Sequence, residues 1–362
     1  MSSDGCDIDT SCTTYHIYPQ KEDYKRITTL VDIEKENPRS RAAKQARREK
    51  KEQKESGNVA EVLESAKCED TFFLHRPYLA FHSPPKVLHS GQDKHADPAI
   101  LIHGSAFWRR FKLQYGKSLK APGVVDPRGV VSWKHNEGDK QYLKTNGKKL
   151  KGYKVRTWRL WGECGKAYVH QVRADRRAGV KPDVDDLVDP NAREKLYPAE
   201  AEGVVYLKWE RPFSRHTRRY HFSYSGLDFY WKGTRATDKT TFCGKFVRFN
   251  HLKLVASLPV VASSRSAKNE IRLARYTSSV SNKKNGRLEI FDGTVLELFE
   301  SYVHRQDRKA PEETKEVKIQ NLKKTVLYQI IVATALCMIT AEKEKREAVG
   351  QWVEEAVKGA GG

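Results

Sequence analysis

The segment that most constrains the fold is an apolar run near the C-terminus, from Val326 to Ala341. On a helix, its valine, leucine, isoleucine and methionine side chains cover the whole circumference. A helix that is apolar all round is surrounded either by protein or by lipid. About sixteen residues at 1.5 Å each span roughly 24 Å, less than the roughly 30 Å hydrocarbon core of a bilayer. We therefore predict a core helix over residues 322–342 that is buried in protein, with a membrane tail anchor as the alternative.

The chain before this helix is rich in signals for short strands. Runs of aromatic and β-branched residues alternate with turn residues from position 71 onward, most densely after residue 204. Ser225-Gly226 and Asn285-Gly286 are expected to form turns, and Asp292-Gly293 to begin another before the apolar run 295–302. Roughly a dozen short strands without βαβ alternation favour an antiparallel sandwich or barrel.

Many strands followed by one apolar terminal helix resemble the tubby C-terminal-like superfamily, which includes tubby, the LURP-one-related proteins and the scramblases. Residues 229–234 and 244–254 are most similar to a group of fungal proteins with that predicted fold. The resemblance implies a mainly β fold, with a closed antiparallel barrel of about twelve strands threaded by the last helix. The tubby signature itself is absent, so the phosphoinositide-binding residues of tubby have no counterparts here, and no scramblase-type calcium segment is found.

The domain organisation follows from shifts in composition. Residues 1–70 are expected to form a flexible N-terminal arm, disordered or helical, with a charged helical stretch at 34–55 that has no apolar stripe. The barrel is expected over 71–346, with an acidic, proline-containing loop insertion at 178–200. Residues 347–362 are expected to be a short tail.

Charge is the clearest indication of a partner. The chain has 67 Lys and Arg against 46 Asp and Glu, for a net charge of +21. The excess lies on the expected barrel, with 22 basic against 11 acidic residues in 101–200 and 18 against 9 in 201–300. A positive field of this kind attracts phosphates, of lipid headgroups or of nucleic acid.

The candidate anion-binding residues cluster on one expected hairpin connection. Arginines interleaved with aromatic residues there could hold a phosphate through paired charges, with a solvated basic loop as the alternative. These residues are Arg211, Arg215, Arg218 and Arg219, with Lys232 on the following strand and a further strand-borne patch at Lys154 and Arg156.

Catalytic and metal-binding patterns are missing from the sequence. It holds no Walker loop, GxGxxG, GxSxG or HExxH. Five histidines between residues 75 and 103 lack cysteines or carboxylates at ligand spacing, and Cys164 with His170 is an incomplete zinc finger. Cys243 has no recognisable base. We therefore expect no enzyme activity, no cofactor and no metal site.

The favoured hypothesis is a non-enzymatic binding or adaptor module for anionic phospholipid headgroups, such as phosphoinositides, or for a protein partner. The alternative is a nuclear nucleic-acid-binding protein, which would use the basic arm at 39–54 and the aromatic residues Tyr230 and Trp231. Six cysteines without CxxC spacing, and no apolar leader, favour an intracellular place: cytoplasmic, membrane-peripheral or nuclear. No transmembrane span is expected.

Overall fold

The structure is a computed structural model. It describes residues 11–20, 24–36, 39–55, 70–79, 82–105, 109–126, 128–132, 135, 146–153, 174, 177–179, 199–210, 219–233, 251–258, 270–279, 284–303 and 314–360. Most of the predicted acidic insertion at 178–200 therefore lies outside the described residues.

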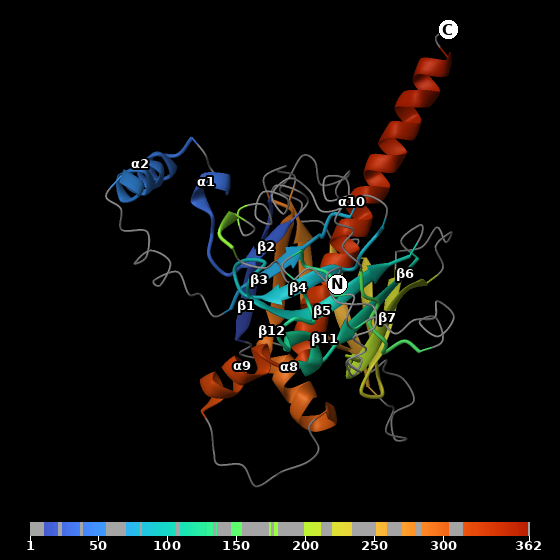
Figure 1. Cartoon of the computed structure of the whole chain (residues 1–362). Coiled ribbons are helices and arrows are strands. Elements are labelled where there is room, and N and C mark those ends of the chain that lie inside the picture. Colours follow the sequence, from blue (N-terminus) through green and yellow to red (C-terminus); the bar gives the residue numbers. More distant parts are fainter. Residues whose placement is uncertain are drawn as a thin grey trace, which may run out of the picture.

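Twelve antiparallel strands close into a barrel, as the sequence predicted (Figure 1). The strands are β1 (Cys12–Pro19), β2 (Lys25–Thr28), β3 (Phe72–His75), β4 (Lys86–Ser90), β5 (Asp97–Gly104), β6 (Arg110–Tyr115), β7 (Gly203–Glu210), β8 (Arg219–Tyr224), β9 (Leu227–Gly233), β10 (Leu252–Ser257), β11 (Glu270–Ser278) and β12 (Gly286–Phe291). Each strand pairs with its neighbours in sequence, and β1 closes the ring by pairing with β12. Closure leaves the sheet without a free edge.

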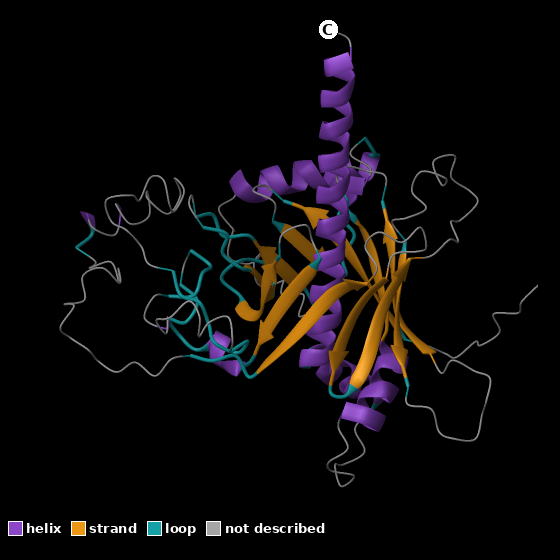
Figure 2. Cartoon of the chain, turned by 90° about the vertical axis from the view of Figure 1, so that its right-hand side faces the viewer, coloured by secondary structure: helices purple, strands orange, loops and turns teal. Residues whose placement is uncertain are grey.

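The predicted apolar helix fills the barrel. Helix α10 (Val326–Ala360) follows α9 (Lys315–Lys323), and every residue from Leu327 to Glu342 is buried. Residues 326–344 are long and apolar enough to cross a membrane, yet 89% of an 18-residue stretch within them is buried inside the protein. Figure 2 shows the strands wrapped around α10, which continues well beyond the barrel. The predicted tail at 347–362 is thus part of the same helix as far as Ala360.

Alternation along the strands explains how the barrel takes in this helix. On β9, Leu227, Phe229 and Trp231 are buried, whereas Asp228 is exposed and Tyr230 is half-buried. Successive side chains of a strand point to opposite faces, so the apolar set faces α10. The inner faces of the strands and the helix together form one continuous hydrophobic core.

Polar contacts fix the helix inside the barrel at three levels. The Trp231 indole Nε1 donates to the Thr334 hydroxyl at 3.0 Å. Near the outgoing end, the Tyr220 hydroxyl donates to Glu342 at 2.8 Å, and near the start the Tyr328 hydroxyl donates to Asp292 at 3.1 Å. Since buried polar groups are costly when unpaired, these contacts specify one depth and one rotation of the helix.

The barrel begins earlier in the chain than predicted. Strands β1 and β2 lie inside the segment expected to be a flexible arm, and β2 pairs with β3 through Ile27 and Phe72. In β1, Tyr15 and Ile17 point into the core, and His16 between them points outward. The predicted flexible arm at 1–70 is therefore wrong for these strands, because in β1 only two core residues alternate with mainly polar ones, which makes a weak strand pattern.

Two further local expectations are corrected. Gly286 is the first residue of β12 and pairs with Ser278, so Asn285-Gly286 is not the tight turn of a hairpin. Residues after Asp292 form helix α8 (Asp292–Leu298) and a π turn, η8 (Phe299–Val303), rather than a strand. The turn at Ser225-Gly226 is confirmed, since φ angles of 49° and 78° are those of a type I′ turn between β8 and β9.

Smaller elements cover the outside of the barrel. The 3-10 helix η3 (Lys117–Lys120) contributes Leu119 to a second apolar cluster, which lies on the outer faces of β4 and β5. Two helices, α1 (Ile33–Glu36) and α2 (Arg41–Glu55), occupy most of the charged stretch at 34–55. In Figures 1 and 2, α2 lies at the end of the barrel from which α10 emerges, and α8 and α9 lie at the other end.

Candidate functional site

Two of the seven predicted anion-binding residues are among those that the structure describes. Arg219 begins β8 and Lys232 lies on β9, directly opposite each other in the antiparallel register. Both stand next to the ring of Tyr230, with the Arg219 guanidinium 3.9 Å and the Lys232 ammonium 5.6 Å from its centre. The others, Arg211, Arg215, Arg218, Lys154 and Arg156, lie outside the described residues.

Each of the two placed cations already has a carboxylate. Arg219 Nε is 2.9 Å from Glu210 Oε2, and Lys232 Nζ is 2.6 Å from Glu270 Oε1. A phosphate at this face would have to displace these carboxylates or draw on further cations. The basic site on β8 and β9 stays a prediction. The two of its residues that the structure describes, Arg219 and Lys232, are each neutralised by a carboxylate.

The same face holds a serine, a histidine and an aspartate in contact. The Ser223 hydroxyl donates to Asp228 Oδ1 at 2.6 Å, and His221 Nε2 lies 2.7 Å from the same oxygen. In an acyl-transfer triad the imidazole lies between the hydroxyl and the carboxylate. Here His221 meets both groups with the same ring nitrogen, since Nε2 lies 3.4 Å from the Ser223 hydroxyl and closer to Asp228, so the imidazole cannot relay a proton between them.

The alternative of a nucleic-acid-binding protein depends in part on two aromatic residues expected to be exposed, Tyr230 and Trp231. Trp231 is 0% exposed and bonded to Thr334, so the expectation is wrong for this residue. Strand alternation explains the difference, since neighbours on β9 must face opposite sides. Tyr230 does face outward, but the Arg219 guanidinium covers its ring.

The structure reveals a different candidate site, a pocket of about 500 Å³ at the end of the barrel from which α10 emerges. We call it the mouth pocket. It lies between α10 and the wall formed by β3 to β6. Its lining comes from the β3–β4 connection, the adjoining ends of β4 and β5, the start of β6 and one face of α10. The volume falls within the range of small-molecule sites in proteins.

The inner part of the mouth pocket is apolar. Leu74, Ile102 and Phe111 from the wall, with Leu336 from α10, are each at most 6% exposed and belong to the main core. The pocket is therefore a gap between the helix and the barrel wall that opens to the outside. An apolar chain inserted there would replace water on surfaces that are otherwise buried.

Thr340 and Cys337 of α10 form part of this floor, and only Thr340 adds a polar group to it. Within the part of the chain that the structure describes, the buried Thr340 hydroxyl has no hydrogen-bond partner, and Thr340 lines the pocket. One turn earlier, burial raises the pKa of the Cys337 thiol to about 12. Because the thiolate is the nucleophile, a protonated Cys337 is a polarisable apolar surface rather than a reactive group.

The rim of the mouth pocket carries charge of both signs. Arg76, His82 and Lys86 line it together with Glu344 of α10. Lys86 Nζ lies 3.7 Å from Glu344 Oε1, a long contact between side chains that are 24% and 33% exposed. A pair at this distance and exposure holds its partners weakly. Little free energy is therefore lost when Lys86 leaves Glu344 to bind an incoming anion.

Two of the histidines that cluster in the sequence are buried on the barrel wall. His75 and His89 have ring centres 6.1 Å apart, and burial lowers the pKa of each, that of His75 to about 4. They are therefore neutral at physiological pH. Among the described residues, no group of three His, Cys, Asp or Glu side chains is placed to hold a metal ion.

The mouth pocket has no marker in the sequence that would have revealed it. Its residues come from five elements, and each of them has an ordinary role as a strand, turn or helix residue. Thr340 and Cys337 were expected only as parts of an apolar helix. The arginines between 211 and 219, by contrast, are visible in the sequence one by one.

Comparison of the chain with protein-family models, with curated proteins and with solved structures finds no match. The resemblance to the tubby C-terminal-like superfamily therefore stays a prediction.

Proposed function

We propose that this protein is a non-enzymatic binding protein for an anionic amphiphile, a molecule with an apolar chain and a phosphate or carboxylate head. The observation that carries the proposal is the mouth pocket, which combines an apolar floor, a buried hydroxyl without a partner among the described residues, and a rim with two cations and one carboxylate. This narrows the expectation of an anionic-lipid-binding module to one place in the fold.

The apolar chain would lie along α10, against Leu336 and Cys337 on one side and Ile102 and Phe111 on the other. Each methylene group removed from water contributes about 0.8 kcal/mol. The Thr340 hydroxyl, which has no hydrogen-bond partner among the described residues, would donate a hydrogen bond to a polar atom near the head or accept one from it. These contacts supply affinity.

The anionic head would lie at the rim. Lys86 would exchange its long contact with Glu344 for a contact with the phosphate or carboxylate, and Arg76 lies on the same rim. Hydrogen bonds between charged partners are roughly twice as strong as neutral ones. These contacts supply the preference for an anion.

The test is calorimetric titration of the full chain with four probes below their micellar concentrations. Dodecyl phosphate has both the chain and the anion, dodecanol lacks the charge, dodecyltrimethylammonium reverses it, and inorganic phosphate lacks the chain. We expect dodecyl phosphate to bind at least about tenfold more tightly than each of the other three. Equal affinity for all three chain-bearing probes would reject the anionic head, and no binding of any would reject the pocket as a site.

A variant separates the two parts of the site. Lys86→Gln removes one rim cation and leaves the floor intact, so the preference for dodecyl phosphate over dodecanol should shrink several-fold, with dodecanol unchanged. Lys120→Gln is the matched control, since Lys120 forms a comparable 3.7 Å pair with Asp97 elsewhere on the barrel. A control with the same effect as Lys86→Gln would place the anion outside the mouth pocket.

A further inference from the structure

One turn of the chain exposes three apolar side chains. Leu30, Val31 and Ile33 are 54%, 49% and 47% exposed, and they lie between β2 and the end of the first turn of α1. Only two other large apolar residues of the described chain, Tyr78 and Val317, are comparably exposed, and neither has such a neighbour in sequence. Exposed apolar residues that cluster mark interaction sites more often than single ones do.

This apolar turn is held rigidly on the barrel. The Thr28 hydroxyl accepts a hydrogen bond from the Leu30 amide at 3.1 Å, and the Asp32 amide donates to the Tyr18 hydroxyl at 2.8 Å. Asp32 also caps α1 by accepting from the Lys35 amide at 3.2 Å. The turn is therefore fixed with its apolar side chains outward.

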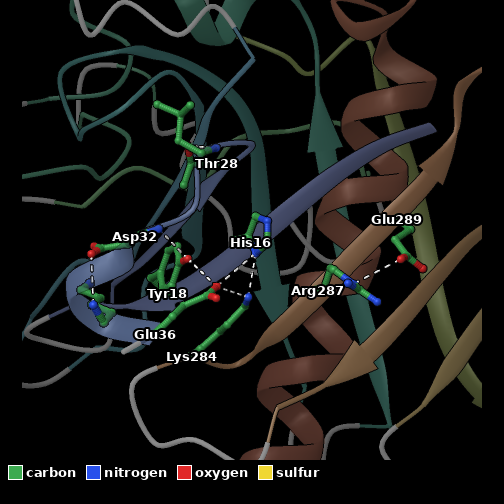
Figure 3. A network of polar contacts seen from close by, with 10 residues as sticks. His16, Tyr18, Thr28, Asp32, Glu36, Lys284, Arg287 and Glu289 are labelled. Atoms are coloured by element: carbon green, nitrogen blue, oxygen red, sulfur yellow. Dashed lines mark hydrogen bonds and ion pairs between the residues drawn. The ribbon is translucent and has the colours of Figure 1, made fainter. Parts of the chain in front are cut away.

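A charged network fastens α1 below the turn. Glu36 accepts hydrogen bonds from the Tyr18 hydroxyl at 3.0 Å and from Lys284, and His16 lies 3.4 Å away (Figure 3). Burial acts to raise the pKa of the Glu36 carboxyl, but hydrogen bonds from Lys284 and Tyr18 and the charge of Lys284 lower it overall. Burial, with Lys284 nearby, also lowers the pKa of His16, which keeps the imidazole neutral. Such a preorganised surface loses little entropy when it binds.

Helix α2 adds a cationic stripe beside the apolar turn. The stripe consists of Arg41, Lys44, Arg48 and Lys51, all exposed. Because these residues are spaced by three or four positions, they share one face of the helix. Ala43, on another face of the helix, is fully buried. α2 packs against α1, and Arg47 of α2 lies 3.8 Å from Glu34 of α1, so the stripe lies next to the turn.

We propose that the apolar turn and the cationic stripe form a docking surface for the headgroup region of an anionic lipid bilayer. Apolar side chains that enter the acyl boundary, with cations that meet the anionic headgroups, are the two contributions that hold proteins on such surfaces. The surface lies at the end of the barrel that carries the mouth pocket. The proposal does not rest on the pocket binding a ligand.

The test is co-sedimentation of the full chain with vesicles. One set is phosphatidylcholine alone, and the other is equal parts phosphatidylcholine and phosphatidylserine. We expect binding to the anionic set only, weakening as salt is added. Failure of the unaltered chain to bind the anionic vesicles overturns the proposal.

Two variants with matched controls locate the surface. The triple change Leu30→Ser, Val31→Ser and Ile33→Ser should lower partition onto anionic vesicles by at least about tenfold. Val317→Ser is its control, because Val317 is 46% exposed on α9 at the opposite end of the barrel. Loss in the control equal to that in the triple variant would show non-specific adhesion and overturn the proposal.

The charge variant Lys44→Glu with Arg48→Glu should also lower partition by about tenfold or more, since it removes two cations from the anionic surface and adds two carboxylates. Its control is Lys315→Glu with Lys324→Glu, which changes the net charge equally on exposed residues at the α9 end. Equal losses in both pairs would mean that net charge alone acts, and would overturn the proposal.

Two other outcomes are also decisive. In the first, the unaltered chain binds an acidic polypeptide and not the vesicles, with that binding lost in both variants. This result would identify an acidic protein as the partner and overturn the proposal. The pocket-filling change Cys337→Phe should leave vesicle binding intact. If the pocket fails to bind amphiphiles, the docking surface is not affected. If the docking surface fails to bind vesicles, the pocket is not affected.

Discussion

The contact between Trp231 and Thr334 joins the barrel wall to its central helix, and it allows that arrangement to be tested in solution. The indole Nε1 donates to the Thr334 hydroxyl at 3.0 Å, and both residues are 0% exposed. The same hydroxyl lies 3.0 Å from the Ile331 carbonyl oxygen within its own helix. In the change Thr334→Val the shape is nearly kept and the acceptor for the indole is removed.

The magnitude follows from the burial of the indole. With the acceptor gone, the N–H is left unpaired in the core, and a buried unpaired donor costs about 1–3 kcal/mol. If Trp231 is first changed to phenylalanine, no donor remains, and Thr334→Val should then be nearly neutral. The double-mutant cycle should therefore give a coupling of about 1–3 kcal/mol.

The assay is urea unfolding of the four proteins, with the free energy of unfolding taken from each. Thr334→Ser serves as the control, because it keeps the hydroxyl and should show no comparable coupling with Trp231. A Thr334→Val cost that is the same with tryptophan and with phenylalanine at position 231 would refute the placement of α10 against β9.

Three further predictions concern stability. The pKa of His75 is about 4 in the folded protein against 6.5 unfolded, so the unfolded state binds more protons between those values. The free energy of unfolding should be highest above pH 6.5 and should fall by up to about 3 kcal/mol toward pH 4. In denaturant titrations His75→Phe should reduce this pH dependence, whereas the exposed His95→Gln should leave it unchanged. Thr340→Val should raise the melting temperature by the equivalent of about 1 kcal/mol, because it removes an unpaired buried hydroxyl, while weakening amphiphile binding; a lower melting temperature would contradict this. Gly129→Ala should cost more than about 2 kcal/mol in urea unfolding, since φ is +77° and the new Cβ would lie 2.0 Å from His75 Nδ1; a neutral result would reject that close approach.

The part of the fold that was predictable is the part where one physical requirement dominates. The segment from Val326 to Ala341 is apolar on all sides, so it had to be surrounded, and the many strands before it supplied what surrounds it. The turn at Ser225-Gly226 was predictable for a similar reason, because its flanking strands alternate clearly on both sides.

Other elements were missed because long-range contacts decide them. Strand β1 holds only Tyr15 and Ile17 as strong inward anchors, and it becomes a strand because β12 and β2 pair with it on either side. Asn285-Gly286 has the dipeptide of a tight turn, but Gly286 is needed in β12, where a Cβ would lie 2.4 Å from the Thr277 carbonyl oxygen. Local preference was outweighed by close backbone packing.

The candidate site was less predictable than the fold. The dense arginines predicted an anion-binding site on β8 and β9. In the structure, Arg219 and Lys232 there each have a carboxylate partner. The mouth pocket depends on the space left between α10 and the wall, and that space is a property of packing rather than of any residue. No periodicity or spacing in the sequence reports it.

The central claim is that the gap between helix and barrel wall is a binding site, and one calorimetric measurement tests it most directly. Cys337→Phe places a ring in the mouth pocket, and Cys12→Phe makes the same change at an exposed cysteine at the start of β1. With both variants shown to be folded by their melting curves, dodecyl phosphate should lose at least about tenfold in affinity for Cys337→Phe and bind Cys12→Phe like the unaltered chain. Unchanged affinity for Cys337→Phe would contradict the account.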